Sequence, residues 1–198
     1  MGLAGFDFEK LNSQWLAAPH QPVNMATAYG VTIDGIAVDG YAWRCIGAYH
    51  LTPDENRGRH NVFIDVLGKD GKRVCNAQIK WRWADNAPIQ TRWLDKPDSE
   101  PACDIPIDKG ATITMWVDSG ALSSEVVTGI HTRHTDEGVG TTYGHHSFYV
   151  VFAQLRTAAV ITPPVIDPPT VPQPETLEAA WAEIHKLWAV VNSWDGGK

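Results

Sequence analysis

The sequence has no apolar run approaching the roughly 18 residues that a membrane-spanning helix needs. It also has no dense run of lysine and arginine, and its formal net charge is −7, so the basic patch of a nucleic-acid binder is missing. The opening residues, MGLAGFDFEKLNSQW, contain no basic region followed by an apolar stretch, so we expect no secretory signal. We therefore expect synthesis in a cytoplasm and neither a membrane nor a nucleic acid as partner.

Cysteine is scarce, with only Cys45, Cys75 and Cys103 in 198 residues. An odd count at irregular spacing does not form a disulfide framework. No two cysteines have the C-x-x-C spacing, which argues against a structural zinc site of that kind. We expect three buried free thiols.

Motifs with a catalytic mechanism are also absent. Ser147 follows His146, but no Gly-x-Ser-x-Gly elbow surrounds it. The sequence has no H-E-x-x-H helix, no phosphate-binding loop and no dinucleotide fingerprint. We therefore predict that the protein is not an enzyme and assign no catalytic residue.

The pattern that is present is that of short strands. Residues 31–156 alternate apolar and polar positions, with Pro, Gly, Asp and Asn between the strands and no helical periodicity. This predicts an all-β domain, an Ig-like or jelly-roll β-sandwich. The strands are expected at residues 42–49, 61–67, 74–83, 111–118, 126–133 and 147–155. The Asp70–Gly71 step predicts a hairpin turn between the second and third of these.

Nine tryptophans are many for this length and could form either core or contact surface. Trp81 and Trp83 share one face of their strand, and we expect both in the core rather than stacked on a sugar. Trp93 lies in a long proline-containing segment, residues 84–110, and is the better candidate for a surface aromatic that binds a ligand.

Residues 1–30 are expected to form an N-terminal arm with a short helix over Phe8–Ala17, capped by Asp7. Phe8, Leu11 and Trp15 share one face of that helix. Two alternatives stay open, a loose arm and an arm that docks on a neighbouring molecule.

The C-terminal part changes character. Residues 157–174 hold six of the thirteen prolines and predict a stiff linker of polyproline II type. Residues 175–198 predict an amphipathic helix with a coiled-coil-like seam. Because large rings occupy one seam position, we expect a homo-oligomer, a trimer or larger; the alternative is a helix that folds back on its own sandwich. The seam residues, spaced 4, 3, 4 and 3 apart, are Leu177, Trp181, Ile184, Trp188 and Val191.

Four of the eight histidines fall within 16 residues, which makes this stretch the second candidate ligand site. We expect a hydrogen-bonded polar patch there and no cofactor. A zinc or calcium ion is the alternative, and a metal-dependent hydrolase would follow from it. The candidate residues are His131, Arg133, His134, His145 and His146.

Two stretches resemble a known kind of domain: residues 43–62, which include HLTPDENRGRHNV, and residues 129–134 with 144–152, which read GIHTRH and GHHSFYVVF. They look like a β-sandwich accessory domain that accompanies bacterial cell-wall lytic enzymes and phage structural proteins. The resemblance covers about residues 31–155 and implies a non-catalytic module.

Taken together, these features predict a structural or adhesion protein of a phage particle, a capsid decoration or tail/fibre component that works in the virion. Other virion proteins or surface glycans are its expected partners. The alternative is a carbohydrate-binding module at a bacterial cell surface, and the alternative locations are cytoplasm and cell surface.

Overall fold

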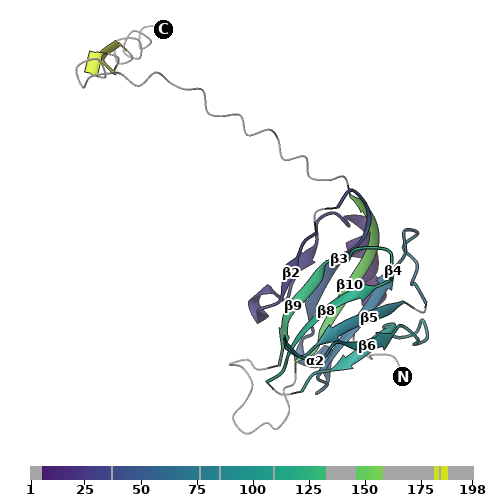
Figure 1. The fold of residues 1–198 in the computed structure, drawn as a ribbon. Coiled ribbons are helices and arrows are strands. Elements are labelled where there is room, and N and C mark those ends of the chain that lie inside the picture. Colours follow the sequence, from purple (N-terminus) through teal and green to yellow (C-terminus); the bar gives the residue numbers. More distant parts are fainter. Residues whose placement is uncertain are drawn as a thin grey trace. The chain divides into compact units, whose positions relative to one another are not determined.

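Two five-stranded β-sheets pack face to face in a computed structural model of the chain (Figure 1). The structure describes residues 6–132 apart from 37, 76, 85 and 109, then residues 146–157, and finally residues 181, 182 and 184–186. The prediction of a β-sandwich is therefore confirmed.

The two sheets differ in their strand directions. The first, sheet A, has the order β1-β3-β10-β4-β7, with β10 antiparallel to β3 but parallel to β4. The second, sheet B, has the order β2-β9-β8-β5-β6 and is antiparallel throughout. The strands are β1 (Val23–Asn24), β2 (Thr32–Asp34), β3 (Gly40–His50), β4 (Asn61–Leu67), β5 (Gln78–Arg82), β6 (Gln90–Trp93), β7 (Cys103–Pro106), β8 (Thr112–Asp118), β9 (Val126–His131) and β10 (Phe148–Thr157). The helical elements are α1 (Phe8–Ala17), the 3-10 turn η1 (Thr27–Tyr29) and α2 (Pro53–Asn56).

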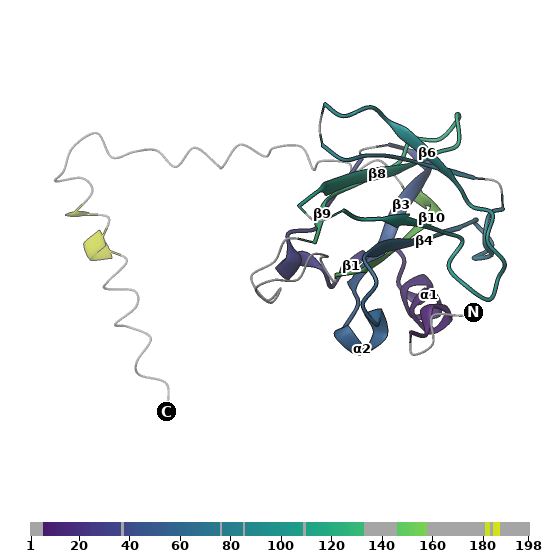
Figure 2. The ribbon, with the colours of Figure 1, turned by 90° about the horizontal axis from the view of Figure 1, so that it is seen from below.

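Helix α1 covers the face of sheet A that points away from sheet B (Figure 2). Its start is the predicted one, because Asp7 accepts a hydrogen bond from the Lys10 amide at 3.0 Å. The Trp15 ring lies directly on Gly47 of β3, where a Cβ atom would overlap it. The described part of the N-terminal segment, from Phe6 on, is therefore not a loose arm, because Phe6, Phe8 and Trp15 pack on its own sandwich.

Both faces of sheet A are covered, so residues on both sides of its central strand are buried. Residues 148–153 of β10 are all buried, because one side faces sheet B and the other faces α1. In β5 of sheet B, buried and partly exposed residues alternate instead. Among the described residues, no helix or strand packs on the outer face of sheet B.

A buried carboxylate lies beneath α1. Asp65 of β4 is fully buried, and its Oδ1 accepts hydrogen bonds from the Ala102 amide and pairs with Arg73, each at 2.9 Å. Its Oδ2 accepts from the Tyr149 hydroxyl at 2.5 Å and from the Asn12 side chain at 3.2 Å. Burial, and then the Asp65 carboxylate, raise the pKa of Tyr149 well above its ordinary value, so the hydroxyl remains a donor. Asp65 thereby joins two strands, helix α1 and two loops.

The predicted hairpin turn forms, but the two strands that it was expected to join do not pair. The turn forms, with the Gly68 amide bonded to the Lys72 carbonyl at 2.7 Å and Gly71 at φ 73°. The chain then crosses to the other sheet, so β4 and β5 do not pair. The hairpin ends after one bridge, between Leu67 and Arg73, and the Arg73 side chain pairs with Asp65.

The chain divides into two compact units, residues 1–160 and 161–198. In the second unit, residues 181, 182 and 184–186 are helical. The predicted linker lies outside the described residues except for Thr157, as do Leu177, Trp188 and Val191. In the described part of the chain, no helix is both long and apolar enough to span a bilayer.

Replacing Arg73 with methionine should destabilise the fold by about 3–5 kcal/mol, because it leaves the Asp65 carboxylate buried without its cation. Denaturant unfolding of the full chain measures the change. The matched control is Lys72→Met, which removes an exposed charge from the same turn and should change stability by less than about 0.5 kcal/mol. Equal stabilities of the two variants would contradict this account of Asp65.

Candidate functional site

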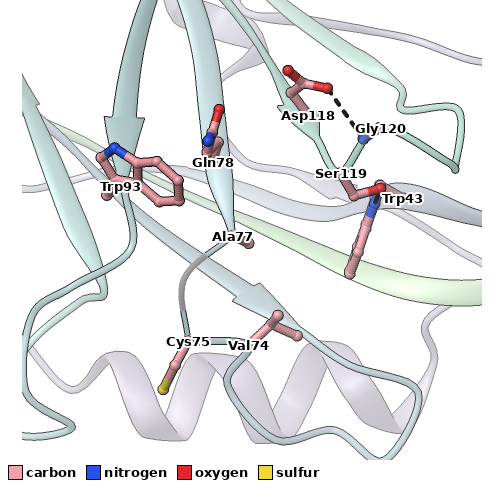
Figure 3. A pocket seen from close by; sticks show the side chains of 9 residues that line it. All are labelled: Trp43, Val74, Cys75, Ala77, Gln78, Trp93, Asp118, Ser119 and Gly120. Atoms are coloured by element: carbon pink, nitrogen blue, oxygen red, sulfur yellow. Dashed lines mark hydrogen bonds between the residues drawn. The ribbon is translucent and has the colours of Figure 1, made fainter.

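A pocket of about 520 Å³ lies at the ends of β5, β6 and β8, with a wall that includes Trp43 of sheet A (Figure 3). Its volume lies in the range of about 300–1,000 Å³ that is usual for small-molecule sites. Strands of both sheets and the crossover between β4 and β5 contribute to its wall. The lining residues are Trp43, Val74, Cys75, Ala77, Gln78, Trp93, Asp118, Ser119 and Gly120.

Three polar or aromatic side chains form a row across neighbouring strands. Gln78 of β5 is the register partner of Trp93 on β6 and of Asp118 on β8. Register partners point to the same side of a sheet, so the three lie side by side, as Figure 3 shows. Their side is the outer one, because the next residue of β5, Ile79, is fully buried in the core.

The opposite wall is fixed by hydrogen bonds. The Trp43 indole N–H donates to Ser119 Oγ at 2.9 Å. Asp118 Oδ1 accepts from the Gly120 amide at 3.2 Å, closing a tight turn in which Gly120 takes φ 73°. The hydroxyl and the turn are therefore held in place before any ligand arrives.

The pocket also offers groups that face solvent. Trp93 is 50% exposed, which is unusual for so large an apolar ring. The side chain of Asp118 is 41% exposed and its Oδ2 lies 3.5 Å from Lys80 Nζ. A ligand in the pocket would thus meet an aromatic face, an amide and a carboxylate.

The lining groups can contact a ligand in two ways. Flat aromatic faces attract apolar C–H surfaces, while amide and carboxylate groups exchange hydrogen bonds with hydroxyls. No histidine lines the pocket, and its hydroxyl group, Ser119, already accepts a bond from Trp43. The exposed thiol of Cys75 also lines the pocket.

The sequence prediction for Trp93 needs one correction. Trp93 is exposed, as expected, but it lies at the end of strand β6 and not in a loop, because residues 84–110 contain both β6 and β7. Trp81 is buried and Trp83 is packed against the core, as predicted. Gln78 and Asp118 were not among the predicted site residues, since their pairing with Trp93 is a long-range contact.

The predicted histidine patch lies at a different place. His146 Nδ1 and His50 Nε2 are 2.6 Å apart, and Tyr29 stacks on His50 with ring centroids 3.5 Å apart. A hydrogen bond between two imidazoles requires one nitrogen to be unprotonated. His131 lies beside Gly30, the residue that follows Tyr29, because its Nε2 is 3.3 Å from the position that a Cβ atom would take at Gly30.

The other patch residues, Arg133, His134 and His145, lie outside the described residues. Within the described ranges, no three His, Cys, Asp or Glu side chains are grouped so as to hold a metal ion. The described part of the patch is a hydrogen-bonded pair of histidines with a stacked tyrosine.

The prediction of three buried thiols is wrong for one of them. Cys45 and Cys103 are buried, but Cys75 is exposed in the crossover that lines the pocket. Burial, followed by the charge of Asp104, raises the pKa of Cys103 to about 12. Burial and the Glu125 carboxylate raise the pKa of Cys45 well above its ordinary value.

No protein-family model, no curated protein and no solved structure matches this chain.

The thiols give a direct check of this arrangement. At pH 8 one cysteine per chain should react rapidly with a thiol reagent in the native protein, and all three should react after denaturation, because only the thiolate is reactive. The Cys75→Ser variant should show no rapid phase. Rapid reaction in that variant would contradict the burial of Cys45 and Cys103.

Proposed function

We propose that the protein is a non-enzymatic adhesion protein whose β-sandwich binds carbohydrate at the Trp93 pocket. The observation that carries this proposal is the half-exposed Trp93 ring beside Gln78 and Asp118 in one preformed pocket. A sugar ring has one apolar face for stacking and equatorial hydroxyls at its rim. The pocket provides a partner for each, with donors and acceptors at the edge of the aromatic ring.

The wider setting that we propose is a phage virion, in which the sandwich is displayed as part of a capsid decoration or a tail fibre. The sequence resemblance to accessory domains supports this setting, and a bacterial surface glycan would be the natural ligand there. An Ig-like or jelly-roll assignment stays a prediction; the parallel pairing of β10 with β4 departs from the antiparallel sheets of both.

Replacing Trp93 with alanine should lower glycan affinity by at least tenfold, because the stacking surface is lost. A glycan array probed with the full chain first identifies binders, and isothermal titration with the best binder measures the loss. The matched control is Tyr41→Ala on β3, an aromatic residue that is 46% exposed but does not line the pocket. Affinity equal in wild type and Trp93→Ala would refute the site, and an array without binders would refute carbohydrate recognition.

A second proposed role is self-association through the C-terminal helix. Trp181 is 57% exposed and Ile184 50% exposed, although both are large apolar residues of the predicted seam. Apolar residues at three- and four-residue spacing pack against a partner helix in coiled coils. Clustering of several sandwiches would raise avidity for a repetitive glycan surface without any new contact in the pocket.

The double variant Trp181→Ser/Ile184→Ser should convert an oligomer of at least three chains into a monomer of 21.8 kDa. Light scattering on the full chain measures the mass. Lys186→Ser, an exposed change in the same helix but outside the seam, should leave the oligomer intact. A monomeric wild-type protein would contradict the role.

A further inference from the structure

The row of Trp93, Gln78 and Asp118 is followed by a second row of side chains on the same face of sheet B. Two residues beyond Gln78 on β5, Lys80 is the register partner of Thr91 on β6 and of Trp116 on β8. The residues on either side of Trp116, Met115 and Val117, are buried in the core, so Trp116 points outward and is partly exposed. The outer face of sheet B therefore carries a second tryptophan, which does not line the pocket.

The two tryptophans are separated diagonally across three strands. Trp93 and Trp116 differ by two strand spacings and by two residues along the strands. Standard sheet dimensions put their backbones roughly 12 Å apart. Because the two tryptophans are on strands that are not adjacent, a ligand that stacks on both must extend across the width of β5.

We infer that the ligand is a glycan chain of at least two sugar rings, which lies diagonally over the outer face of sheet B and stacks on both Trp93 and Trp116. This inference rests on the proposed carbohydrate function and specifies the length and direction of the ligand. One ring occupies the pocket at Trp93. A later ring of the same chain contacts Trp116.

The polar residues on the strand between the two tryptophans can form hydrogen bonds with the middle of such a glycan chain. Gln78 and Lys80 lie on β5, the strand between the tryptophans, and Lys80 Nζ is 3.5 Å from Asp118 Oδ2. An ammonium donates hydrogen bonds and a carboxylate accepts them, so the pair matches two adjacent hydroxyls on a sugar. The side-chain amide of Gln78 adds one donor group and one acceptor group.

The same charges argue against a protein partner on this face. The cores of protein interfaces are depleted of charged residues, yet Lys80 is on the strand between the two tryptophans and pairs with Asp118. An apolar partner would desolvate that ion pair at considerable cost. A hydrated glycan can replace the lost water with its own hydroxyls, at little such cost.

The test compares single sugars with their own oligomers on one glycan array, probed with the full chain and its variants. Only glycans of two or more rings should bind strongly. Trp116→Ala should weaken the best oligomer by roughly three- to tenfold, as expected for one lost aromatic contact. Trp116→Phe keeps a ring and should retain most of the affinity, and Tyr41→Ala again serves as the control.

Each other outcome overturns a defined part of the account. Single sugars that bind as tightly as oligomers, or an unchanged affinity in Trp116→Ala with an unchanged unfolding midpoint, would refute the extended site and leave the Trp93 pocket standing. A change in the mass of the Trp116→Ala protein in solution would show that the face joins copies of the chain, and would refute a glycan there. An array without any binder would refute the proposed function itself.

Discussion

The buried carboxylate of Asp65 is the constraint on which the rest of the structure depends. A buried charge is tolerated only when its lone pairs are satisfied, and Asp65 draws its donors from α1, β10, the turn after β4 and the loop before β7. The anchored Arg73 is followed directly by Val74 and Cys75, which form part of the pocket wall. The interaction that fixes α1 on sheet A therefore also fixes the segment that enters sheet B.

The two sheets consequently have different roles. Sheet A is covered on both faces, and its central strand β10 is apolar on both sides, so it serves as the rigid centre of the fold. Sheet B has one side in the core, while its other side presents Trp93, Trp116 and a polar set between them. Sheet B therefore offers a preformed, partly aromatic surface on a rigid support, so a ligand bound there would cost the protein little ordering entropy.

The sequence correctly predicted those elements that depend on residues close together in the chain. Asp7 as cap, the helix that follows it, the alternation of β5 and the turn at Gly71 all depend on residues close in the chain. The site, in contrast, depends on Trp93 pairing with Gln78, and on Gln78 pairing with Asp118 on its other side. Such contacts join distant residues, so spacing alone suggested Trp93 as an isolated surface ring and favoured the histidines as the richer site.

The central claim is that a glycan contacts the outer face of sheet B, and the indole N–H signals of the nine tryptophans report on it individually. The most direct measurement is a nitrogen-15 spectrum of the full chain, with and without the tightest-binding glycan, with signals assigned through Trp93→Phe and Trp116→Phe. The account predicts that the signals of Trp93 and Trp116 shift on saturation. Unchanged signals of both, with the glycan bound, would contradict it.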